Sequence, residues 1–321
     1  MRSFAAANAR LGLALLALFI LMGVYFGNHP RGLSLRVLTI WSNQGILLAL
    51  AALAQFSVVL VKGIDLSVGS VVALTNVAAS YWVLDDGLAA LPWILLVLLV
   101  GVLCGLINGL LVVVGRLQPI VVTLATASVF GGLALLWRPV PGGKISERLS
   151  DLATYDFLGL PVSLLLGLFL SAALSLILRK TPYGLSLYAI GSSEGSARLT
   201  GVRVGLVKLC AYAQGGFFGA VTGLYVGMVT LSGDPGIAGA YTLHSVAAVV
   251  LGGVALTGGV GGPFNALVGA LILKTIASLM FFSGVPPLAQ PFFEGIILAG
   301  AIALGALGAL RAKNRLKAFD L

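Results

Sequence analysis

Residues 93–137 read WILLVLLVGVLCGLINGLLVVVGRLQPIVVTLATASVFGGLALLW and carry one charged side chain, Arg116. The stretch divides into two apolar runs, 93–115 and 118–137, on either side of a short polar connection. A helix of about 20 apolar residues is long enough to cross the hydrocarbon core of a bilayer. Each run therefore predicts one membrane-spanning helix.

The rest of the chain has the same character. Of its 321 residues, 59% are hydrophobic and 9% are charged, whereas about 25% of residues are charged in a soluble domain. So few charges cannot cover the surface of a soluble fold, and the apolar runs lack the alternation of barrel strands. The sequence predicts an all-α polytopic membrane protein with about ten transmembrane helices. The ten runs are 11–27, 40–61, 66–83, 93–115, 118–137, 157–178, 206–231, 241–257, 260–283 and 288–310.

Basic residues are distributed unevenly between the connections. If the N terminus is cytoplasmic, thirteen of the nineteen Lys and Arg residues fall on the cytoplasmic side, five fall outside, and Lys274 lies within a span. Cytoplasmic loops of membrane proteins carry this excess. We therefore expect both termini in the cytoplasm and a single membrane domain over 1–321. This bias accounts for the net charge of +9 without a nucleic-acid partner.

Two connections are long. The outer one, 138–156, contains prolines, glycines and mixed charges. The inner one, 179–205, reads RKTPYGLSLYAIGSSEGSARLTGVRVG and carries one acid, Glu194. Ser192 and Ser193, directly before Glu194, are residues that start helices, so the inner connection is predicted to contain short helices.

No enzyme signature is present. The Lys-Thr pairs at 180–181 and 274–275 lack the glycine that precedes lysine in a phosphate-binding loop. The two cysteines lie inside apolar runs and give no disulfide framework, and two histidines are too few for a metal cluster. We expect no catalytic residue, metal or cofactor, and ATP-driven transport would need an ATPase in another subunit.

The stretch 62–69, KGIDLSVG, lies between two apolar runs. Gly63 and Gly69 let the backbone break its helix, which a membrane tolerates where protein or water lines the gap. Asp65 then has two compatible interpretations, a cap on the following helix or a functional group in the break. The pattern G-x-x-L-[S/T]-x-G recurs at 253–259. Either the chain contains a repeat of two halves, as transporters often do, or the match is chance in a glycine-rich chain.

Other polar residues fall within the runs. Lys274 and Glu294 lie ten residues either side of Gly284, so a turn there would bring them to similar depth. They either pair, since a lone lysine at mid-bilayer costs about 2.5–3.5 kcal/mol, or are accommodated separately, with Glu294 in the first turn of a helix that starts near Pro291. Asn76 and Asn108 are expected to form interhelical hydrogen bonds, with a solute-path role as the alternative.

Small residues at four-residue spacing, Gly101, Gly105 and Gly109, also predict close packing of one helix against another.

Several blocks, taken in order, resemble one family. VVLVKGIDLSVGS at 58–70 is similar to the permease subunits of monosaccharide-class bacterial ABC importers, the ribose, arabinose, xylose and galactose type. Three further blocks resemble the same family. They are GLINGLLVVVGRLQPIVVTLATASVFGGLAL at 105–135, YGLSLYAIGSSEGSARLTGV at 183–202 and AAVVLGGVALTGGVGG at 247–262. The resemblance covers about 45–310.

This resemblance implies an importer of the bacterial inner membrane, with a permease dimer, cytoplasmic ABC ATPase subunits and a periplasmic sugar-binding protein. It implies passage of a monosaccharide into the cytoplasm. The ATPase-docking loop of the family corresponds to 179–205. Its coupling residues would be Gly191, Glu194, Ala197, Arg198, Leu199 and Gly201. Asp65, Ser67, Asn76 and Asn108 are the candidates for the solute path.

Three departures from the family's pattern are expected to matter. Gly195 and Ser196 follow Glu194 where the family reads Glu-Ala-Ala; Thr242 and His244 replace acids; and Lys62 replaces a small residue. They lead to the hypothesis that this chain pairs with a second, more typical permease, a homodimer being the alternative.

Other functions stay open. The same machinery can serve nucleosides or branched-chain amino acids. An ion-coupled secondary transporter would use Asp65, Lys274 and Glu294 as couplers. A non-transporting membrane scaffold is the third alternative.

Overall fold

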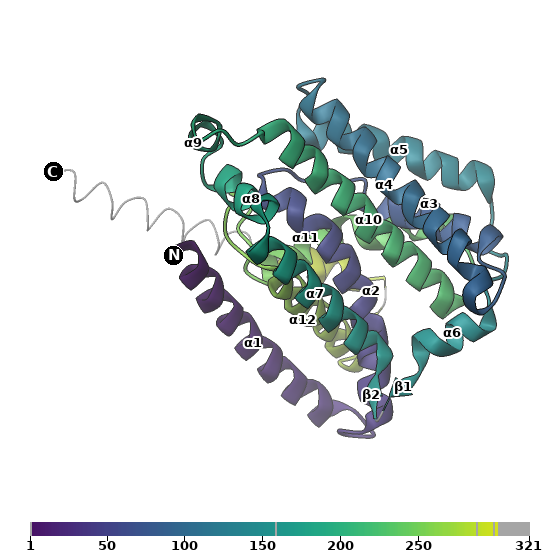
Figure 1. Cartoon of the computed structure of the whole chain (residues 1–321). Coiled ribbons are helices and arrows are strands. Elements are labelled where there is room, and N and C mark those ends of the chain that lie inside the picture. Colours follow the sequence, from purple (N-terminus) through teal and green to yellow (C-terminus); the bar gives the residue numbers. More distant parts are fainter. Residues whose placement is uncertain (1, 158, 287, 298, 301–321) are drawn as a thin grey trace.

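A computed structural model describes residues 2–157, 159–286, 288–297 and 299–300, and they form a bundle of tilted helices (Figure 1). Within these described residues, seven helices are long and apolar enough to cross a membrane. These are α1 (Arg2–Asn28), α2 (Leu35–Leu60), α4 (Leu91–Val113), α5 (Pro119–Trp137), α7 (Val162–Lys180), α10 (Val204–Thr230) and α12 (Pro263–Phe282). The all-α polytopic membrane fold is confirmed.

Two of the ten apolar runs form shorter helices. They are α3 (Val68–Trp82) and α11 (Ala238–Leu251), about 22 and 21 Å long at 1.5 Å per residue, less than the roughly 30 Å of a hydrocarbon core. Each adjoins a break in the helical chain, 61–67 before α3 and 252–262 after α11. Of the last predicted run, 288–310, residues 290–297 are helical and most of the remainder lies outside the described residues. The number of spans and the side of each terminus stay predictions.

The connections contain the remaining elements. They are η1 (Gly87–Ala90), α6 (Glu147–Thr154), β1 (Asp156–Phe157), β2 (Leu160–Pro161), α8 (Pro182–Ser192), α9 (Glu194–Leu199) and η2 (Pro235–Ile237). β1 and β2 form a small antiparallel hairpin, with Asp156 opposite Pro161. The short helices predicted in 179–205 are α8 and α9, and Ser193 caps α9 by accepting a hydrogen bond from the Ser196 amide at 3.3 Å.

Helix α2 lies at the centre of the bundle. In its most apolar stretch 83% of residues are buried, against 17% for α1 at the periphery. A helix that is hydrophobic all round is buried on every side, and the run from Ile46 to Leu60 fits this description with small alanines between its larger side chains. Helices α10, α11 and α12 all pack against it.

The predicted close packing of the glycine-spaced helix is confirmed, and its partner is α10. An added Cβ at Gly105 would lie 2.1 Å from the carbonyl oxygen of Tyr212, and one at Gly101 would lie 2.4 Å from that of Gly216. No side chain fits at such distances, so glycine is required where the two backbones meet.

The two ends of the bundle differ. Helices α8 and α9 lie at the same end as the N terminus, whereas α6 and the β1–β2 hairpin lie at the opposite end (Figure 1). This arrangement agrees with the predicted placement of 179–205 on the side of the N terminus and of 138–156 on the other.

Candidate functional site

The break between α2 and α3 is held by Asp65. Its Oδ1 accepts hydrogen bonds from the Ser67 amide at 2.8 Å and from the Ser67 hydroxyl at 2.6 Å. Both side chains are at most 2% exposed. In the amide orientation that satisfies both groups, Gln55 also pairs with the backbone N–H and C=O of Asp65. The predicted cap is wrong in this respect, because the N-cap residue of α3 is Ser67 and no side chain caps the helix, so Asp65 instead closes the turn directly before it.

Two other helices complete this cluster. Asn108 of α4 donates from Nδ2 to the Ser67 hydroxyl at 2.7 Å and accepts at Oδ1 from the Thr126 hydroxyl of α5 at 2.6 Å. The Leu66 amide donates to the Thr123 hydroxyl at 3.0 Å. Hydrogen bonds between helices compensate for polar groups buried away from water. The cluster fixes the break relative to α4 and α5.

A second polar contact lies at the other end of α3. Asn76 donates from Nδ2 to the carbonyl oxygens of Gly223 and Ser232, both at 3.2 Å, and accepts from the Asp234 amide at 2.7 Å. It ties α3 to α10 and to the connection before η2. Asn76 and Asn108 are 0% exposed, so the expected interhelical hydrogen bonds are confirmed, and a solute-path role for them and for Asp65 and Ser67 stays a prediction.

The α8–α9 connection presents an exposed charged surface. Glu194 accepts a hydrogen bond from Lys208 of α10 at 2.7 Å and from Arg198 at 3.3 Å. The Lys208 hydrogen bond lowers the pKa of Glu194, against the opposing effect of its partial burial. The carboxylate therefore stays ionised and fastens α9 to α10.

The other predicted coupling residues divide into two groups. Leu199 is 91% exposed and the Arg198 side chain is 72% exposed, so both are free to meet another protein. Ala197 is the buried residue of α9. Gly201 has a positive φ of 82°, and the chain turns there from α9 toward α10. Gly191 is buried as well, which places it in the packing behind the surface.

Gly191 lies at a junction of three backbone segments. An added Cβ there would lie 2.2 Å from the Leu60 carbonyl oxygen and 2.3 Å from the Gly259 nitrogen. The Gly259 amide also donates to the Leu60 carbonyl at 3.0 Å. The end of α8 therefore contacts the last residue of α2, directly before the break 61–67, and the glycine-rich connection 252–262.

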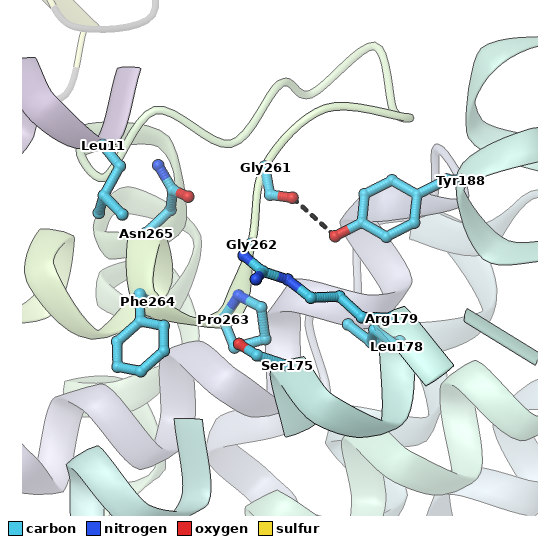
Figure 2. Close-up of a pocket in the computed structure, with 10 residues that line it drawn as sticks. All are labelled: Leu11, Ser175, Leu178, Arg179, Tyr188, Gly261, Gly262, Pro263, Phe264 and Asn265. Atoms are coloured by element: carbon cyan, nitrogen blue, oxygen red, sulfur yellow. Dashed lines mark hydrogen bonds between the residues drawn. The ribbon is translucent and has the colours of Figure 1, made fainter. Parts of the chain in front are cut away.

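A second contact joins α8 to the same loop. The Tyr188 hydroxyl donates to the Gly261 carbonyl at 2.8 Å, beside a small pocket that Arg179, Pro263 and Asn265 also line (Figure 2). With the Gly191 junction, it is the second contact between α8 and the loop that precedes α12. The recurrence of the pattern at 253–259 thus lies close to the break 61–67, whose sequence it resembles. An origin in two repeated halves stays a prediction.

Glu294 has a different partner from the one considered in the sequence. It lies 2.5 Å from His244 Nε2 of α11, and Lys274 is not within 4 Å of it, although the two charges still interact electrostatically. Helix 290–297 begins close to Pro291, as predicted. Among the described residues no group of three or more His, Cys, Asp or Glu side chains can hold a metal ion.

Three of these features are not predicted from the sequence: the junction at Gly191, the amide of Gln55 at the break, and the His244–Glu294 pair. The His244–Glu294 pair had one signal in the sequence, which is that His244 stands where the family has an acid. The loss of a charge at one position is often accompanied by a compensating residue at another.

Known proteins resemble this chain over almost its whole length. Residues 37–302 match the family described as the permease component of the branched-chain amino acid transport system. The ribose import permease protein of Haemophilus influenzae is 32% identical over 292 residues, covering 89% of this chain and 90% of the relative. That of Bacillus subtilis is 33% identical, with 90% of each chain covered.

A relative with another cargo is similarly close. The autoinducer 2 import system permease protein of Yersinia enterocolitica is 33% identical, covering 90% of this chain and 80% of the relative. No solved structure matches. The long apolar helices and these relatives identify a multi-pass protein of the bacterial inner membrane and a transporter subunit rather than an enzyme. Such permeases work with an ATPase and a substrate-binding protein. The chain belongs to the permease subunits of bacterial ABC importers of the monosaccharide class.

Proposed function

We propose that this chain passes a monosaccharide from a periplasmic binding protein into the cytoplasm. The observation that carries the proposal is the similarity to two ribose import permeases over about nine-tenths of the chain. The relative for autoinducer 2 and the branched-chain amino acid description of the family leave other small solutes as outcomes of the test. The selective step belongs to the binding protein, so the permease itself need not bind tightly.

The element 179–205 is proposed as the ATPase-docking loop of the permease domain, on the cytoplasmic side. Leu199 and Arg198 would enter a groove of the ATPase, since they are the exposed apolar and charged residues of α9. Glu194 anchors α9 to Lys208, so that a push on α9 is carried into α10 and α8. The Gly191 junction would then transmit the movement to both breaks.

The second permease subunit is proposed to be a different chain. Gly195 and Ser196 weaken the helix propensity of α9, and His244 occupies an otherwise acidic position. A partner with the more usual residues would supply one typical docking loop in each pair. Co-purification of the complete complex tests this arrangement, and recovery of one permease species alone would exclude it.

Reconstitution in liposomes with the cognate ATPase and binding protein tests the function. We expect uptake of a pentose or hexose that requires ATP, and that is lost with Arg198→Glu while the protein stays folded. Arg116→Glu, another charge reversal at an exposed residue but in the connection between α4 and α5, outside 179–205, is the control and should retain uptake. Uptake driven by an ion gradient without the ATPase would overturn the proposal.

A further inference from the structure

A cavity of about 390 Å³ lies between α1, α2 and α12. Its volume is within the range of small-molecule sites. Tyr25, His29, Phe281 and Phe282 form its aromatic part, with the Tyr25 and Phe282 ring centroids 5.7 Å apart. Gln44, Lys274, Ser278 and Gln290 supply its polar groups. Two lining residues, His29 after the end of α1 and Phe282 at the end of α12, lie at the end of the bundle opposite α8 and α9.

Lys274 lies deep in this cavity. It is about 12 Å along the axis from the end of α12 and about 17 Å from its start, near the middle of the membrane-crossing part. Within the described residues its ammonium makes no hydrogen bond and no ion pair within 4 Å. Intramembrane lysines face water-filled cavities and mark substrate paths. The position is thus that of a polar group available to a solute.

Gln44 has the same availability. Its side chain lines the cavity from α2, and in the described part of the chain no protein group satisfies its amide. An amide offers two donors and an acceptor, and an ammonium offers three donors. Together they match hydroxyl groups, which both donate and accept.

Glu294 supplies a charge opposite to that of Lys274. Glu294 interacts electrostatically with it and is itself hydrogen-bonded to His244 at 2.5 Å. The ammonium of Lys274 and the carboxylate of Glu294 have opposite charges, which compensate each other. An anion gains little from a cation that is already compensated, whereas a neutral hydroxyl still gains hydrogen bonds. Aromatic rings beside a few placed polar groups suit a small ring compound with one less polar face.

Resting on the proposed function, we infer that this cavity is a binding site for a neutral polyhydroxylated solute on its way from the binding protein. Lys274 and Gln44 hold its hydroxyls, and Tyr25 and Phe282 pack against its ring.

Uptake tests the assignment. In ATP-dependent uptake by the reconstituted importer, Lys274→Gln should raise the KM for sugar roughly tenfold or more, the loss expected for a hydrogen bond to a charged group. Gln44→Leu should raise it roughly two- to tenfold, because the amide is neutral and exposed. Basal ATP hydrolysis should be unchanged. Lys144→Gln, the same substitution at an exposed residue of the outer connection, should behave as the unsubstituted protein. Equal KM values in all variants would overturn the site and leave the importer function intact.

An experiment without transport separates the two failures. In a background with Cys104 and Cys210 replaced by alanine, Ala277→Cys places a thiol in the cavity wall. We expect a membrane-impermeant maleimide to label it from outside, and millimolar ribose or another neutral sugar of the panel to slow the labelling at least threefold, whereas sugar phosphates should not. Leu88→Cys, exposed outside the cavity, should label equally with and without sugar. Protection that is absent, or that favours sugar phosphates, overturns the inference even if uptake proceeds.

Discussion

The junction at Gly191 gives the most specific test of how the docking loop acts on the membrane part. Gly191→Ala adds one methyl group at a point where the Leu60 carbonyl oxygen would lie 2.2 Å away and the Gly259 nitrogen 2.3 Å away. Both neighbours are backbone atoms, so neither can turn aside as a flexible side chain would. The end of α8 must move by about 1 Å or the break must open.

The energetic effect follows from three contributions. Overpacking of a buried site costs about 1–3 kcal/mol, and separation of the Gly259 amide from the Leu60 carbonyl costs about 0.5–1.5 kcal/mol more. Alanine regains up to about 1 kcal/mol of helix propensity. The net loss is about 0.5–4.5 kcal/mol, and a loss of about 2.5 kcal/mol, in the middle of this range, changes the equilibrium between coupled and uncoupled arrangements about 70-fold.

The assay is the number of sugar molecules imported per ATP hydrolysed, with thermal unfolding measured on the same preparation. We expect Gly191→Ala to hydrolyse ATP while uptake falls at least fivefold. Gly195→Ala is the matched control, because its Cβ would have no neighbour within 4 Å and helix propensity favours it. Unchanged coupling in Gly191→Ala, or an equal loss in Gly195→Ala, would refute the role of the junction.

Three further perturbations address other contacts. Glu194→Gln removes the ion pair with Lys208, and because the Glu194 side chain is 40% exposed we expect α9 to lose only about 0.2–1 kcal/mol, seen as greater mobility of a spin label at Leu199→Cys. The lowered pKa of Glu194 means that this contribution is complete above the unfolded pKa of about 4.3 and is lost as pH falls through the lower folded pKa, where the two proteins should become alike; a difference that persists at pH 2.5 would contradict it. Gly105→Ala brings a Cβ to 2.1 Å from the Tyr212 carbonyl oxygen and should lower the free energy of thermal unfolding by about 1–3 kcal/mol. Gly132→Ala, where the added Cβ has no neighbour within 4 Å, should not. Equal melting temperatures would show that α4 and α10 can move apart to accept the methyl group. Asn108→Ala removes the hydrogen bonds to Ser67 and Thr126 and should cost about 1–2 kcal/mol; an unchanged melting temperature would mean that water replaces the amide.

The amino-acid sequence alone determined that this protein folds in a lipid bilayer, and it determined much of the local structure. Few charges and long apolar runs require a membrane, and glycines at four-residue spacing indicate a close helix contact. Ser193 before Glu194 was enough to predict the start of α9. Each of these properties depends on composition or on residues within one or two turns of each other.

Only the tertiary structure decided which distant groups meet. Gly105 predicts a close neighbour without naming α10, and Glu294 has two possible partners at similar depth until α11 brings His244 to 2.5 Å. The meeting of Gly191, Leu60 and Gly259 has no local pattern, because backbone atoms of three separate segments make it. The cavity at Lys274 likewise exists because α1 and α2 pack beside α12. Periodicity along a chain specifies the face that a helix buries, and the neighbour on that face depends on how all the helices pack at once.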